Sequence, residues 1–112
     1  MLAASSRDAV RSRSRTGKPY RELRSDWTDA WDGPDGAGPL PMPLQQGISS
    51  PALRRVDTLT AQGHPGAQKL ATSFIGQGVG LMNQTRPVKD VVYKMVEDFL
   101  AAADRLRSTL ED

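Results

Sequence analysis

The sequence contains no cysteine and a single histidine, His64. Without cysteine the chain can form no disulfide, no zinc ribbon and no iron–sulfur cluster, and it offers no thiol for catalysis. One histidine excludes a metal site built on several histidines and any catalytic arrangement that needs two of them. The absence of cysteine also fits a reducing compartment.

Long apolar runs are absent as well. No stretch approaches the roughly 18 apolar residues of a membrane span, and Arg7 and Asp8 interrupt the start before the apolar core of a signal peptide could form. The net charge of +2 on 112 residues is nearly balanced, so the overall charge does not indicate any particular class of binding partner. We therefore expect one small domain at most, soluble and cytoplasmic.

The end of the chain carries the strongest helix signal. Its apolar residues recur at steps of three and four, which is typical of one helical face, and charged residues fill the other face. Pro87 suits the first helical position, because its missing N–H would be unpaired there. We predict an amphipathic helix from Pro87 whose apolar face another body must cover. That face is made of Val88, Val91, Val92, Met95, Val96, Phe99, Leu100, Ala103, Leu106 and Leu110.

Basic residues gather near the start. The first 24 residues hold seven of the fifteen basic side chains and two acidic ones. An arm containing Arg11, Arg13 and Arg15 could contact nucleic-acid phosphates, and the simpler interpretation is an extended segment with its arginines in solvent. Tyr20 is the only aromatic residue available for base stacking in this stretch, so we do not expect a nucleic-acid partner.

Two further amphipathic patterns precede the final helix. The first starts near Pro19 and carries Trp27 and Trp31 one turn apart, which predicts a helix whose tryptophans pack against a larger body. The second starts at Pro51, after two serines that would cap it, and the Gly-His-Pro-Gly turn at residues 63–66 would end it.

Composition divides the chain into three parts. Residues 1–32 form a basic segment with one strand pattern at residues 10–14, residues 33–48 form a linker rich in proline and glycine, and residues 49–112 hold the C-terminal helices. The fold class is mainly α with at most one or two short strands. Four aspartates without a nearby basic residue lie before and within the linker, and they lack the remaining ligands of a calcium loop. These are Asp26, Asp29, Asp32 and Asp35.

Several short motifs follow one another in a recognisable order. They are Ser14-Arg15-Thr16-Gly17-Lys18-Pro19, Trp27-Thr28-Asp29-Ala30-Trp31, Pro39-Leu40-Pro41-Met42-Pro43-Leu44-Gln45, Ile75-Gly76-Gln77-Gly78-Val79-Gly80 and Thr85-Arg86-Pro87-Val88. This succession, from about residue 11 to 110, resembles the C-terminal part of the nitronate monooxygenase (2-nitropropane dioxygenase) family. The family consists of FMN-dependent oxidoreductases with a (β/α)8 TIM-barrel fold.

The resemblance implies that this chain is one portion of a larger enzyme. A barrel takes about 250 residues, and the family's flavin-binding and catalytic residues lie upstream of the part seen here. Residues 1–32 would then be the end of the barrel, and residues 49–112 a helical cap and tail. We assign no catalytic, cofactor-binding or metal residue in this chain. FMN is expected in the complete enzyme and not on this chain alone.

Two sets of residues gain candidate roles from the resemblance. Met42, Gln45 and Gln46 would lie on the substrate side of the flavin, the other interpretation being ordinary packing of the linker. The glycine motif would pack closely against the barrel, the other interpretation being direct ligand contact. Its residues are Gly76, Gln77 and Gly78.

The expected function is that of a C-terminal fragment of a flavin enzyme. The complete enzyme would oxidise alkyl nitronates or related small substrates, and the fragment alone would be inactive, with the missing barrel as its partner. The alternative is a free-standing helical module that binds another protein through the Trp27 and Trp31 face and the stripe of the final helix.

Overall fold

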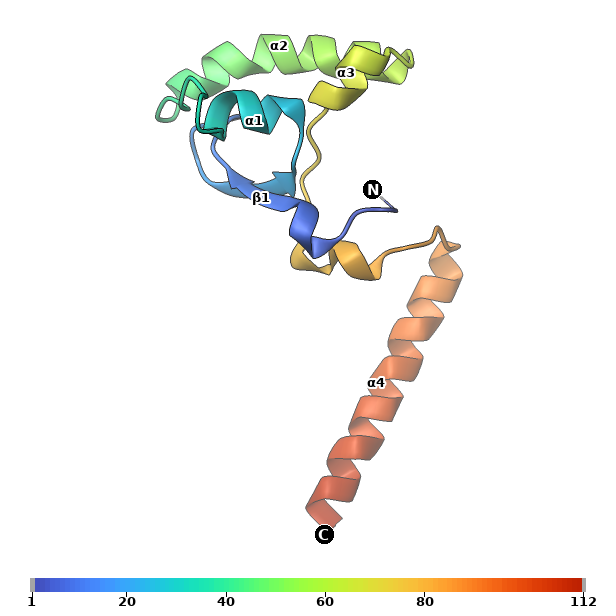
Figure 1. Cartoon of the computed structure of the whole chain (residues 1–112). Coiled ribbons are helices and arrows are strands. Elements are labelled where there is room, and N and C mark those ends of the chain that lie inside the picture. The colour runs from blue at the N-terminus through green and yellow to red at the C-terminus, as the bar shows by residue number, and fades with distance from the viewer. Residues whose placement is uncertain (1, 112) are drawn as a thin grey trace.

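The computed structural model describes residues 2–111 and shows a small body from which one long helix projects (Figure 1). The molecule is elongated, with principal extents of 59 × 31 × 23 Å. As predicted, the chain is mainly helical with a single two-stranded sheet in the described residues. The elements in chain order are η1 (Ser6–Asp8), β1 (Ala9–Ser12), β2 (Tyr20–Leu23), α1 (Asp26–Asp32), α2 (Leu44–Ala61), α3 (Pro65–Leu70), η2 (Gln77–Leu81) and α4 (Val88–Glu111).

Strands β1 and β2 form an antiparallel hairpin, in which Ala9 lies opposite Leu23 and Ser12 lies opposite Tyr20. The prediction of a helix beginning at Pro19 is therefore wrong for β2. Tyr20 and Leu23, which helical spacing would place on one face, lie instead on opposite faces of β2, because side chains alternate along a strand. Strand pairing wins because both edges of β2 find backbone partners.

The second edge of β2 pairs with a segment from the far side of the sequence. Leu23 N–H donates to Ser73 O at 3.1 Å, and Ile75 N–H donates to Arg21 O at 3.2 Å. Phe74 lies opposite Glu22 between them. Residues 73–75 thus cover the second edge of β2 through this short pairing, so β2 has no open edge along this stretch.

The hairpin loop lies close to the linker that precedes α2. Gly17 has φ +85°, and a Cβ atom at this position would lie 2.4 Å from Met42 N and 2.7 Å from Leu40 O. Only glycine has the positive φ without strain and the space for this approach. The antiparallel hairpin differs from the parallel pairing of barrel strands, and the placement of residues 1–32 at the end of a barrel stays a prediction.

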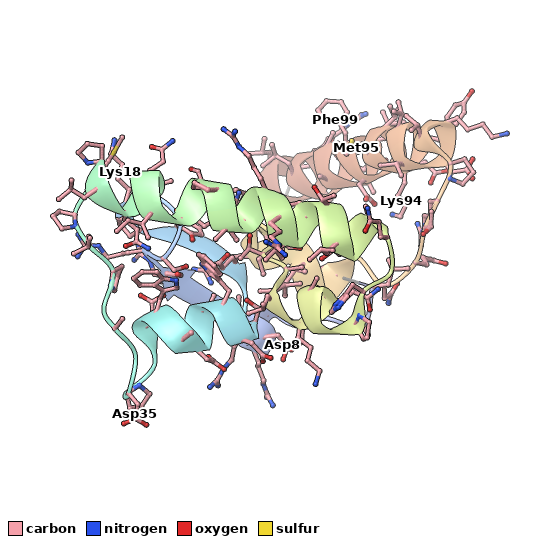
Figure 2. The ribbon with its side chains drawn as sticks, turned by 90° about the horizontal axis from the view of Figure 1, so that it is seen from above. Asp8, Lys18, Asp35, Lys94, Met95 and Phe99 are labelled. Carbon is pink, nitrogen blue, oxygen red and sulfur yellow. The ribbon has the colours of Figure 1, made fainter. Side chains whose placement is uncertain are left out.

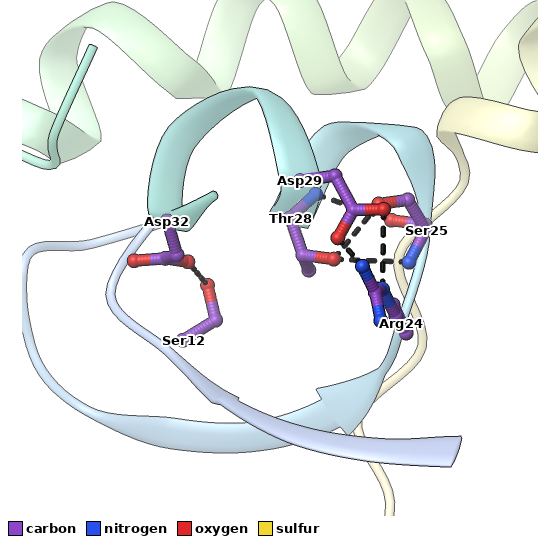
Figure 3. Close-up of polar contacts among 6 residues, drawn as sticks. All are labelled: Ser12, Arg24, Ser25, Thr28, Asp29 and Asp32. Carbon is purple, nitrogen blue, oxygen red and sulfur yellow. Dashed lines mark hydrogen bonds and ion pairs between the residues drawn. The ribbon is translucent and has the colours of Figure 1, made fainter. Parts of the chain in front are cut away.

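Helix α1 is short and capped at its start. Ser25 Oγ accepts from Thr28 N–H at 3.4 Å, and Ser25 N–H donates to Thr28 Oγ1 at 3.0 Å, so the two residues form a capping box (Figure 3). Arg24 Nε donates to Asp29 Oδ1 at 2.9 Å. The prediction that the aspartates lack a basic neighbour is therefore wrong for Asp29.

Helix α2 begins at Leu44, seven residues before the predicted start, so that Pro51 lies inside it. Proline at this position deprives the carbonyl of Gly47 of its helical partner. Two side chains of the early turns hold the helix to the hairpin loop despite this loss. Gln45 Nε2 donates to Ser14 O at 2.6 Å, and Ser49 Oγ donates to Arg15 O.

The turn after α2 follows the sequence prediction. Gly63 adopts φ +80°, which ends the helix, and His64 Nδ1 accepts from Ala67 N–H at 3.3 Å at the start of α3. His64 is therefore a turn residue and a helix cap.

The apolar core is small and lies mainly where α1, α2 and α3 meet. Its buried side chains are Trp27, Leu53, Val56, Ala67 and Val79. Helix α4 contributes none of them and has no buried residue, although it begins within one residue of the predicted start. Figure 2 shows Met95 and Phe99 extending from α4, and the Phe99 side chain is 70% exposed. The predicted apolar face therefore exists and is uncovered in residues 2–111.

Candidate functional site

A buried polar cluster lies between the hairpin, α1 and α2. Its fully or almost fully buried members are Ser12, Ser14, Glu22, Gln45 and Ser49. Sequence analysis missed this cluster, because the run from Arg11 to Arg15 was interpreted as solvated. The alternation of arginine and serine was the available signal, since a strand with period two directs the serines inward and the arginines outward.

Short contacts connect the members of the cluster. Ser12 Oγ lies 2.5 Å from Asp32 Oδ2 (Figure 3) and 2.7 Å from Ser14 Oγ. Ser14 Oγ is also 3.2 Å from Tyr20 Oη and 3.4 Å from Glu22 Oε1. These contacts satisfy polar groups that would otherwise be costly to bury.

Among residues 2–111, Glu22 is the one ionisable side chain that is completely buried. Desolvation raises the pKa of its carboxyl, and hydrogen bonds from Ser12, Tyr20 and Ser14 lower it in part. Its Oε2 atom has no hydrogen-bond partner. Perturbed carboxyls of this kind occur at catalytic sites, but no part of Glu22 is accessible to a ligand in the body described here. We assign it to the architecture of the hairpin.

The three residues with a predicted substrate-side role lie in different environments. Gln45 is fully buried, and its Oε1 accepts from Leu40 N–H at 2.9 Å while its amide binds the hairpin loop. Met42 is 46% exposed on the linker, and Gln46 lines a cavity. The contacts of Gln45 support linker packing for that residue. A substrate role for Met42 and Gln46 stays a prediction.

The cavity beside Gln46 has a volume of about 220 Å³ and lies between the hairpin loop and α2. Arg15 forms one of its walls. The Arg15 side chain donates from Nη1 to Thr72 Oγ1 at 2.7 Å, and its guanidinium lies 4.6 Å from the centre of the Phe74 ring. The lining residues are Arg15, Thr16, Gln46, Ser49, Ser50, Leu53, Arg54, Asp57 and Phe74.

The glycine motif makes no close backbone contact within the described chain. A Cβ atom at Gly76 or Gly78 would meet nothing within 4 Å, whereas one at Gly80 would lie 3.2 Å from Ser6 N. The close backbone approach in this segment is at Gly80, where η2 meets η1. Packing of Gly76, Gln77 and Gly78 against a barrel stays a prediction.

The two tryptophans of α1 differ in exposure. Trp27 is buried among α1, α2 and α3, and its ring centre lies 6.1 Å from that of Trp31, which is half-buried. The body of the chain itself covers Trp27, so the expectation that both tryptophans face a missing surface is wrong for this residue. Beside it runs an apolar groove of about 480 Å³ that includes Leu59 and Leu70.

None of the helices between residues 2 and 111 combines the length and the apolar character that a membrane crossing requires. The chain is mainly helical, and the apolar face of α4 is uncovered in the described residues. No protein-family model matches the chain, and no solved structure matches it.

The chain is similar to part of a longer protein. It is 46% identical over 110 residues to a Mycobacterium tuberculosis protein named "Putative monooxygenase Rv1533". The match covers 98% of this chain and 29% of that protein, so most of the relative has no counterpart here. The similarity supports the predicted relation to oxidoreductases at the level of a monooxygenase.

Proposed function

We propose that this chain is the C-terminal part of an FMN-dependent oxidoreductase similar to nitronate monooxygenases, and that it is inactive without the remainder. The similarity to one portion of a longer monooxygenase carries this proposal. Oxidation of a small substrate such as an alkyl nitronate is the chemistry that FMN would supply in the complete enzyme. The residues that bind flavin would belong to the portion without a counterpart here.

Neither the cavity beside Arg15 nor the groove beside Trp27, both formed by described residues, fits FMN. The polar cavity beside Arg15, at about 220 Å³, is smaller than the usual range for cofactor pockets, which begins at about 300 Å³. The larger groove beside Trp27 is lined mainly by apolar side chains, and no glycine-rich phosphate loop borders it. We therefore derive no catalytic step from these residues.

The exposed stripe of α4 supports a structural role within a larger protein. A helix with a continuous apolar face gains most of its stability by packing that face against another element. Its opposite face carries charged residues, including ion pairs one turn apart between Lys94 and Asp98 and between Arg107 and Glu111. The remainder of the enzyme would cover the stripe. Its most exposed members include Val88, Met95, Phe99, Leu106 and Leu110.

A chimera tests the proposal. The 110 matching residues of the Mycobacterium tuberculosis protein are replaced by those of this chain, and bound flavin and oxygen uptake with an alkyl nitronate are compared with the parent. We expect the chimera to retain both. A second chimera with Phe99→Asp should lose them, and one with Lys94→Gln, on the solvated face, should not.

The outcome that would refute the proposal is a parent protein that holds FMN and a folded chimera that does not. The isolated chain provides a second measurement. Mixed with FMN and passed through gel filtration, it should carry no absorbance at about 450 nm, the region of the flavin chromophore. Stoichiometric flavin would show a cofactor site within these 112 residues.

A second candidate function is a free-standing module that binds a partner protein through α4. The observation in its favour is that the body buries Trp27 and completes its sheet with residues 73–75 without help from α4. A helix with one apolar face can then dock into a groove of another protein. In sedimentation velocity, a well-folded monomer or discrete dimer favours the module, and aggregation favours the fragment.

A further inference from the structure

We propose that the cavity between the β1–β2 loop and α2 binds a small oxyanion, a carboxylate or phosphate group, through the guanidinium groups of Arg15 and Arg54. This site is independent of the flavin chemistry considered above. It requires only residues that this chain itself brings together, from the hairpin loop, from α2 and from the segment around Phe74.

The cavity has an excess of positive charge. Two arginines and one carboxylate, Asp57, line it. The ion pairs in the described residues are Arg24 with Asp29, Lys94 with Asp98 and Arg107 with Glu111, so neither Arg15 nor Arg54 has a carboxylate partner there. Guanidinium groups bind carboxylate and phosphate in a forked geometry with two parallel hydrogen bonds. Two of them at one cavity are suited to hold a single oxyanion.

Arg15 is held in place before any ligand arrives. Its side chain donates to Thr72 Oγ1 and lies over Phe74, whose ring packs edge-on against Tyr20 with 4.9 Å between the ring centres. Its backbone is fixed as well, because Arg15 N–H donates to Tyr20 Oη at 2.9 Å and Ser49 Oγ donates to Arg15 O. Binding therefore needs little ordering of this residue, which favours affinity.

Neutral groups complete the wall around the two charges. Thr16 Oγ1 accepts from Lys18 N–H at 3.2 Å, which leaves its own O–H free to donate to an anion. Ser50 and the amide of Gln46 also line the cavity. Phe74 is 56% exposed and offers an apolar surface beside Arg15. A volume of about 220 Å³ admits phosphate or a small aromatic carboxylate.

The charge of Asp57 predicts the direction in which one substitution changes the affinity for an oxyanion. Asp57 lies three residues after Arg54, on the same side of α2, and lines the same cavity. Its negative charge repels an incoming oxyanion. Removing that charge should strengthen binding, whereas a residue that contributed only to folding would have no such effect.

The test is a titration of the 112-residue chain, labelled with nitrogen-15, with sodium phosphate and separately with sodium benzoate at constant ionic strength. We expect saturable shifts of the Thr16 and Ser50 amide signals. Arg54→Gln should weaken binding about tenfold, as expected for one charge-assisted contact, and Asp57→Asn should tighten it several-fold. The matched control is Arg55→Gln, which removes the same charge from the neighbouring residue, on the side of the apolar groove; it should leave binding unchanged.

The two ligands distinguish the form of the oxyanion. Tighter binding of phosphate identifies a phosphate group. Tighter binding of benzoate that Phe74→Ala reduces identifies a carboxylate attached to an apolar group. Shifts that stay linear for both ligands, or that match those produced by sodium chloride, would overturn the proposal. So would equal effects of Arg54→Gln and Arg55→Gln.

Discussion

Replacement of Gln45 by leucine should destabilise the fold strongly, because the Gln45 side chain joins three segments in a fully buried position. Its amide donates to Ser14 O at 2.6 Å, and its Oε1 accepts from Leu40 N–H at 2.9 Å. Leucine has a similar volume and no hydrogen-bonding group. The substitution therefore leaves one backbone acceptor and one backbone donor without a partner.

The magnitude follows from the two lost contacts. Leaving a buried polar group unpaired costs about 1–3 kcal/mol, so Gln45→Leu, which loses two contacts, should lower the free energy of unfolding by about 2–6 kcal/mol. In a chain of this size that corresponds to a fall in Tm of about 10 °C or more. Gln46→Leu is the control, since Gln46 is exposed at the edge of the cavity and should change stability by about 0.5 kcal/mol or less.

Urea unfolding followed by tryptophan fluorescence measures both variants, because Trp27 is buried in the folded state. Equal stability of Gln45→Leu and Gln46→Leu would refute the structural role of Gln45. If Gln45→Leu were stable but abolished activity in the chimera with the Mycobacterium tuberculosis protein, the substrate-side role predicted from the sequence would be right instead.

Three further predictions follow from single positions. Gly47→Ala should raise the free energy of unfolding by about 0.5–1 kcal/mol, because Gly47 lies in α2 with open space around it. Gly17→Ala should lower the free energy of unfolding by at least about 2 kcal/mol, because Gly17 has a positive φ and Met42 N lies close to it. Thermal unfolding of both variants checks this pair. The raised pKa of Glu22 means that the folded state holds the carboxyl proton to higher pH than the unfolded state does, so the stability that the protonated carboxyl contributes is present below the ordinary pKa of 4.5 and is lost as the pH rises through the raised pKa. Glu22→Gln should flatten this decline in the urea midpoint with pH, and Glu97→Gln on α4 should not. Phe99→Asp should leave the urea midpoint unchanged, since α4 buries nothing, and should reduce self-association in sedimentation experiments, a result that a rise in aggregation would contradict.

The final helix and the turn at His64 could be predicted because local sequence determines them. An apolar repeat over six turns predicts α4, and the proline before it predicts where the helix begins. The sequence also shows that the apolar face of α4 needs a cover, and the structure confirms that residues 2–111 do not provide one. These features depend on neighbours in the sequence and not on distant contacts.

The hairpin and the start of α2 could not be predicted in the same way. β2 is held as a strand by β1 on one edge and by residues 73–75, fifty or more positions away, on the other. Helix α2 continues through Pro51 because Gln45 and Ser49 are held by the hairpin loop. The cavity beside Arg15 depends on the same distant pairings, so it is visible only after folding. Tertiary contacts override local preference at each of these places.

Residues 73–75 have one more consequence, which concerns the connection between the two halves of the molecule. They lie directly before η2, and η2 leads within a few residues to α4. A protein surface that binds α4 therefore also restrains residues 73–75, which cover the second edge of β2. The connecting segment at residues 76–87 would then set the orientation of the hairpin, and of the cavity beside Arg15, relative to that surface.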